Sequence, residues 1–207
     1  MSPHERSWAA YPIVFIASGC TLVLELVAGR IMAPFVGVSI QTWTSVIGIV
    51  LAGISLGNYL GGALADRRSS DRTLGLLLAA GGLASLAVLP LASGLGPLTP
   101  RSYPLILRIV LLTTLLFFAP SLLLGMVTPV AIRSALDDLA GAGKVVGRMY
   151  AASTAGSLAG AFLTGFVLVA YFGTRSIILS VGLTLIVLGG LAGAFGRGAT
   201  SAAAVRA

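Results

Sequence analysis

The chain has 207 residues, of which 57% are apolar and only 9% are charged. A soluble domain usually carries about 25% charged residues because its surface faces water, so this composition excludes an ordinary water-soluble protein. The formal charge of +7 is attributed to membrane topology, because no soluble domain is present to carry a basic face. We therefore expect no nucleic-acid partner.

Six runs without charged side chains predict six membrane-spanning helices. About 20 helical residues cross the ~30 Å hydrocarbon core of a bilayer, and lipid favours helices because each then satisfies its own backbone hydrogen bonds. We expect an all-α, polytopic membrane protein with a spanning domain over residues 10–195 and tails at 1–9 and 196–207. The helices are expected near 10–31, 41–64, 74–95, 104–128, 145–170 and 174–195.

The positions of Lys and Arg predict the orientation. With the N-terminus inside, nine of these residues fall in cytoplasmic segments and four in outer segments, in agreement with the positive-inside rule. We expect a multi-pass protein of a prokaryotic plasma membrane with both termini in the cytoplasm. A cleaved signal peptide is the alternative for the first run, but no small-residue cleavage site precedes Glu25, so a retained helix is favoured.

A weak internal repeat links the second and fifth predicted spans. Residues 57–64, GNYLGGAL, resemble residues 156–163, GSLAGAFL. The first three and last three spans are therefore candidate repeats, and because three is odd the two copies would be inverted relative to each other. The alternative is that both segments are only close-packing helix faces rich in Gly and Ala.

Glycines recur every four residues in these two spans, at Gly53, Gly57 and Gly61 and at Gly156 and Gly160. A missing side chain lets two helix backbones approach closely, which favours association inside lipid. We predict that these glycines pack tightly within the bundle; a sliding interface in a moving transporter is the alternative.

Glu25 is the one acidic residue inside a predicted span, about 20 Å into the first helix and in its outer half. A carboxyl in lipid is costly, so it should face the bundle interior, a cavity or a cation. In one interpretation it pairs with an arginine near the outer surface; in the other it binds a cationic substrate or carries a proton. The arginines available for pairing are Arg30, Arg108 and Arg175.

Other polar groups in the spans are candidates to line a substrate site with Glu25. In the alternative, their hydroxyls hydrogen-bond back to carbonyls of their own helix, which is the commoner arrangement. The candidates are Thr21, Asn58, Tyr59, Tyr150, Ser153, Thr154, Ser157 and Thr164.

Three charged residues are assigned structural roles. Arg30, followed by Pro34 and Gly37, is expected to mark the break of the first helix at the outer surface. Asp66 and Arg67 are expected either to hold the start of the third span electrostatically or to lie in a solvated loop.

The chain offers little for a metal or a cofactor. His4 is the sole histidine and Cys20 the sole cysteine, which argues against a zinc site and a disulfide. A phosphate-binding loop of the Walker type is absent from the sequence. We expect no metal and no cofactor, and a single intramembrane carboxyl makes an intramembrane enzyme the weakest hypothesis.

Several stretches carry a resemblance to a known family. They are residues 25–37 (ELVAGRIMAPFVG), Trp43, residues 53–66, residues 125–129 and residues 147–160. Together they resemble the membrane region of spermidine synthase-like membrane proteins, in which a major-facilitator-like bundle is fused to a soluble aminopropyltransferase-like domain. The resemblance implies a half-major-facilitator-like bundle. The 207 residues contain no such soluble domain, so any aminopropyl or methyl transfer would belong to a separate soluble partner.

Two functional hypotheses follow from the residues and the resemblance together. In the first, the bundle binds or transports a small, polyamine-like cation at Glu25, and a homodimer rebuilds a full facilitator. In the second, the chain is a non-catalytic anchor whose charged loops, 66–72 and 133–148, dock a soluble synthase-like enzyme or another membrane subunit.

Overall fold

The computed structural model describes the fold of residues 3–67, 71–100, 102–136 and 141–204, and the side chains between residues 10 and 194 of these ranges. Every regular element within them is a helix, which confirms the all-α prediction. Parts of the two predicted docking loops, residues 68–70 and 137–140, lie outside the described residues.

Within these described ranges, six helical spans are long and apolar enough to cross a membrane, as predicted. Four of them lie in single helices, and two of these helices extend into the predicted tails, because α1 begins at Pro3 and α9 ends at Ala204. The four are α1 (Pro3–Val36), α2 (Ile40–Arg67), α3 (Asp71–Leu98) and α9 (Thr174–Ala204).

The fourth and fifth spans are each built from several helical segments with one π-helical turn. Pro120 lies just after the π-turn of the fourth span. Because proline has no backbone N–H, it accounts for the local change in the helical hydrogen-bond pattern. The fourth span comprises α4 (Leu105–Thr113), η1 (Thr114–Phe118), α5 (Ala119–Gly125) and α6 (Val127–Ala135). The fifth comprises α7 (Ala142–Leu163), η3 (Thr164–Leu168) and α8 (Val169–Tyr171).

The first helix ends after Arg30, in the segment predicted from Pro34 and Gly37, but a few residues later than residue 31, where its end was expected. Helix α1 continues through Pro34 to Val36. It stops at Gly37, whose φ of 79° is left-handed and whose N–H donates to the Ala33 carbonyl at 2.9 Å. A glycine in this conformation is a common helix terminator. Glu25 consequently lies closer to the middle of the span Ala10–Val36 than predicted, although it is still past the midpoint.

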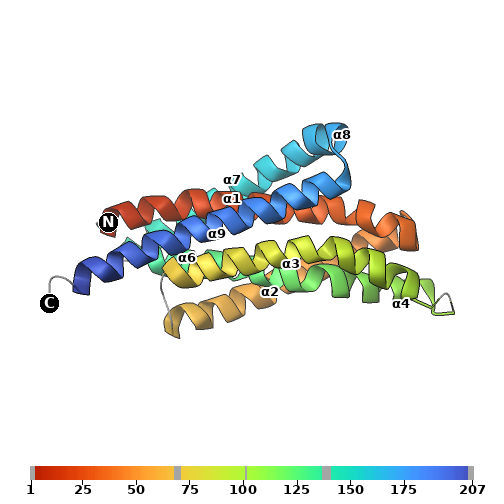
Figure 1. Ribbon diagram of the computed structural model, residues 1–207, viewed down its shortest axis with the longest axis horizontal. Helices are drawn as coiled ribbons and strands as arrows, with labels where there is room; N and C mark the ends of the chain where they lie inside the picture. Colours follow the sequence, from red (N-terminus) through yellow and green to blue (C-terminus); the bar gives the residue numbers. More distant parts are fainter. Residues whose placement is uncertain (1–2, 68–70, 101, 137–140, 205–207) are drawn as a thin grey trace.

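The six spans associate as three pairs. Helix α1 packs mainly on α7, α3 on α9, and α2 on the fourth span. Figure 1 shows α3 and α9 side by side along the bundle, and both chain ends at the same end of the molecule. If spans 1, 2 and 3 are exchanged in order with spans 4, 5 and 6, the same three pairs result. The pairing is therefore symmetric between the two halves of the chain.

The glycine contacts of α2 and α7 show the same correspondence between the two halves at the level of single residues. A Cβ at Gly57 would overlap the carbonyl oxygen of Leu122, and a Cβ at Gly156 would overlap that of Phe15. One turn later, a Cβ at Gly61 would lie 2.7 Å from the Met126 Cα, and one at Gly160 would lie 2.9 Å from the Gly19 Cα. Adding 107 to the number carries Phe15 to Leu122 and Gly19 to Met126, while adding 99 carries Gly57 to Gly156 and Gly61 to Gly160.

The third and sixth spans obey the same shift of 107 positions. A Cβ added at Gly75 would lie 2.6 Å from the Gly189 carbonyl oxygen, and a Cβ added at Gly82 would lie 2.7 Å from the Gly182 carbonyl oxygen. Adding 107 carries Gly75 to Gly182 and Gly82 to Gly189. The contact between Gly75 and Gly189 therefore corresponds to the contact between Gly182 and Gly82. The two halves therefore form inverted three-helix repeats, and the glycines pack helices closely, as predicted.

Candidate functional site

A polar cavity of about 170 Å³, open to the surface of the bundle, lies where the first, second, fourth and fifth spans meet. Its wall consists of Ser18, Thr21, Leu22 and Glu25 from α1, Ile54 and Asn58 from α2, Leu124, Gly125 and Thr128 from the fourth span, and Tyr150, Ser153 and Ser157 from α7.

The cavity brings together most of the predicted site residues. Six of them line it, although they come from three helices far apart in sequence: Thr21, Glu25, Asn58, Tyr150, Ser153 and Ser157.

Three candidates, Tyr59, Thr154 and Thr164, do not line the cavity. Tyr59 is 75% exposed and lies on the face of α2 that no other described helix covers, next to the cavity residue Asn58. Thr154 is likewise exposed, next to the cavity residue Ser153 on α7. Because these helices turn about 100° per residue, neighbours in sequence point to different sides.

Several cavity residues occupy equivalent positions in the two repeats. The shift of 107 positions carries Thr21 to Thr128, and both line the cavity. The shift of 99 positions carries Asn58 to Ser157, which both line it as well. The cavity therefore lies at the interface between the two repeats. Thr128 was missing from the sequence prediction, and extending the repeat alignment to the first and fourth spans would have found it.

The cavity hydroxyls divide between two kinds of partner. Thr21 donates to the Ala17 carbonyl of its own helix at 2.9 Å, which is the commoner arrangement for a helical hydroxyl. Ser18 and Ser153 instead bond to each other at 2.8 Å between their oxygens, and Ser157 donates to the Ser18 carbonyl at 3.5 Å. These two bonds fasten α7 to α1 along the cavity wall. Thr164, outside the cavity, donates back to Gly160 at 2.7 Å.

Glu25 is half-buried in this cavity, and no described residue forms an ion pair or hydrogen bond with its carboxyl. The predicted arginine pairing is not observed. Arg30 donates to the Val169 carbonyl at 3.4 Å, which ties α1 to the end of the fifth span. Arg108 donates to the Phe35 carbonyl at 3.2 Å. Glu25 is also the only acidic residue among those lining the cavity.

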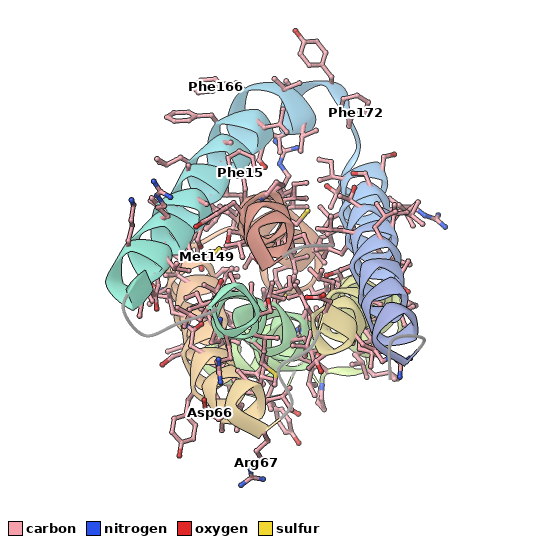
Figure 2. The ribbon with its side chains drawn as sticks, turned by 90° about the vertical axis from the view of Figure 1, so that its left-hand side faces the viewer. Phe15, Asp66, Arg67, Met149, Phe166 and Phe172 are labelled. Atoms are coloured by element: carbon pink, nitrogen blue, oxygen red, sulfur yellow. The ribbon has the colours of Figure 1, made fainter. Side chains whose placement is uncertain are left out.

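Asp66 and Arg67 end α2 at the rim of the bundle. Both are exposed, and Figure 2 shows Arg67 pointing away from the helices. Within the part of the chain that the structure describes, neither forms an ion pair with the start of α3. They are therefore solvent-exposed, as the second interpretation expected, but they belong to the last turn of α2 and not to a loop.

The chain matches no protein-family model, no curated protein sequence and no solved structure. The likeness to spermidine synthase-like membrane proteins therefore stays a prediction from the sequence. The residues that the structure describes form an all-helical protein with six helices long and apolar enough to span a membrane. They are built as inverted repeats around a polar cavity that holds one carboxyl.

Proposed function

We propose that this chain binds a small cationic solute, of the polyamine class, in the interhelical cavity and carries it across the membrane. One observation supports the proposal above all: an unpaired carboxyl, Glu25, lies near the middle of a membrane span in a polar cavity. An ionisable group at that depth is costly unless it has a partner, and such groups mark substrate or ion pathways. A cationic amine would supply the missing charge.

The surrounding polar groups suit an amine. An ammonium group donates hydrogen bonds and accepts none, so it needs oxygen acceptors around the charge. Tyr150, Ser153, Asn58 and Thr128 supply such oxygens from three helices around Glu25. The methylene groups of a polyamine would contact the apolar parts of the wall, Leu22 and Ile54.

The inverted repeats support movement of the solute as well as binding. Transporters built this way hold their substrate near the bilayer midplane at the repeat interface and expose it alternately to the two sides of the membrane. The cavity likewise lies at the repeat interface, since both repeats contribute matched residues to it.

A second copy of the chain would complete the site. The second and fifth spans are the least buried of the six, and the cavity residues Asn58 and Tyr150 on them are exposed. The neighbouring Tyr59 and Thr154 place further polar groups on the same uncovered faces. Because polar groups are poorly accommodated by lipid, we propose that these faces pack against their counterparts in a homodimer.

Calorimetric titration of the purified protein in detergent with spermidine tests the binding step. We expect saturable binding that weakens at least tenfold in Glu25→Gln, because the amide keeps the shape and removes the charge. Asp66→Asn makes the same chemical change at an exposed carboxyl outside the cavity and should bind as the parent does. Equal binding by the parent and Glu25→Gln would refute the role of Glu25.

Flux through liposomes separates transport from binding alone. Reconstituted protein should take up labelled spermidine, and Glu25→Gln should reduce uptake to the level of empty vesicles. Folded protein that binds no amine at millimolar concentration would favour the anchoring role. Copurification of a soluble enzyme with the membrane fraction would then be the next measurement.

A further inference from the structure

A second and larger hollow, of about 590 Å³, lies on the outside of the bundle between α1 and α7. It shares no lining residue with the interhelical cavity. Tyr11, Pro12 and Phe15 of α1 form one side, and Ala152 and Arg148 of α7 form the other. We call this hollow the α1–α7 groove. Its wall is apolar except for the Arg148 side chain and the Tyr11 hydroxyl.

The crossing of the two helices accounts for the groove. Their backbones touch where Gly156 meets Phe15 and Gly160 meets Gly19, and Figure 1 shows them crossing at an angle. On the N-terminal side of this contact α7 presents Ala152 and then Arg148, one and two turns before Gly156. Figure 2, which looks at the bundle from that end, shows Phe15 in the space between the two helices.

The other repeat shows that the fold does not require this groove. The counterpart of Ala152 is Gly53, and an added Cβ there would lie 2.8 Å from the Ser121 Cβ of α5. The corresponding space is therefore closed by direct helix contact. The counterpart of Arg148 is Ile49, which carries no charge. An open groove with a cation at its end is thus a property of one repeat only.

We propose that the α1–α7 groove binds an anionic phospholipid, with an acyl chain along the apolar wall and the headgroup phosphate on Arg148. An open apolar groove on a membrane-facing surface is filled by lipid tails, and the guanidinium adds selectivity because it pairs with phosphate in a charge-assisted hydrogen bond. Lys144 is exposed one turn before Arg148 and adds a second cation. Basic pockets between helices on the cytoplasmic side are known to hold anionic headgroups, and this end is predicted to face the cytoplasm.

Native mass spectrometry of the protein released from detergent tests the lipid site. With phosphatidylglycerol and phosphatidylcholine of identical acyl chains, we expect at least fivefold greater retention of phosphatidylglycerol. Arg148→Gln should abolish that preference, and Arg148→Lys should keep most of it. Arg175→Gln removes an exposed cation at the start of α9, away from the groove, and should change nothing.

A second variant tests the apolar half of the site. Ala152→Trp would fill the groove and should lower retention of both lipids, while circular dichroism and the melting temperature report that the variant is folded. Soluble glycerol phosphate should not compete with phosphatidylglycerol, because it lacks the acyl chain. Equal retention of the two lipids by the parent, or an unchanged preference in Arg148→Gln, would overturn the proposal.

Discussion

Ser18 and Ser153 share a hydrogen bond of 2.8 Å between their side-chain oxygens. The bond joins the first helix of one inverted repeat to the middle helix of the other, on the wall of the cavity that contains Glu25. Both side chains are only partly buried, so the bond is accessible to whatever occupies the cavity. A solute that competes for either hydroxyl would weaken the link between the repeats.

We expect Ser18→Ala and Ser153→Ala each to lower the free energy of unfolding by about 1 kcal/mol, a typical value for an interhelical hydrogen bond in a membrane. The double variant should lose little more than either single one, because both remove the same bond. Unfolding in detergent with increasing SDS, followed by circular dichroism, measures the cycle. Fully additive losses would show that the bond contributes nothing.

Substitution by alanine should lower stability at glycines that contact another helix backbone and should not lower it at glycines with open space around them. Gly156→Ala places a methyl group against the Phe15 carbonyl oxygen, and we expect a loss of about 2 kcal/mol from the resulting backbone displacement. Gly48 has nothing within 4 Å of an added Cβ. Gly48→Ala should therefore be neutral or raise stability by up to ~1 kcal/mol through helix propensity. Melting temperatures of the purified variants decide between these outcomes.

Arg108 should stabilise the end of α1. Its guanidinium donates to the Phe35 carbonyl at 3.2 Å, at the C-terminal end of a helix where a cation is favourable. We expect Arg108→Met to cost about 1–2 kcal/mol, because the carbonyl loses a charged donor. Arg175→Met, at an exposed arginine of α9, is the control and should melt with the parent. An unchanged melting temperature in Arg108→Met would refute the capping role.

The predicted orientation is tested with reporter fusions. The structure places both termini at one end of the bundle (Figure 1), and the distribution of Lys and Arg predicts that this end is cytoplasmic. Alkaline phosphatase fused after Ala204 should be inactive, whereas a fusion after Leu98 should be active. The opposite result for both fusions would reverse the orientation and leave the fold unchanged.

The number of spans and the repeat were predictable because both follow from local sequence. Charged residues cannot be frequent within a span, so their spacing marks the helices. The glycine segments that begin at Gly57 and Gly156 have direct structural equivalents because backbone contact tolerates no larger residue at those positions. The end of α1 was misplaced because Pro34 is tolerated inside a last turn that Gly37 closes.

The cavity was predictable only in part. Glu25 stands out in sequence because a carboxyl in a span is rare. Which face of α2 or α7 turns inward depends on the helices packed against it, and the sequence does not show this. Tyr59 and Thr154 were therefore predicted together with the residues that do line the cavity. The partners of Arg30 and Arg108 turned out to be backbone carbonyls. A charge count cannot foresee such partners, because every residue has a carbonyl.

The backbone contacts at the glycines also limit how the molecule can deform. Where two helices touch main chain to main chain, sliding one past the other requires many close contacts to break together. We therefore expect α1 and α7 to move as one rigid body, α3 and α9 as another, and α2 with the fourth span as a third. The cavity lies on the seam between the first and third of these bodies, so a hinge along that seam would open it without unpacking any helix pair.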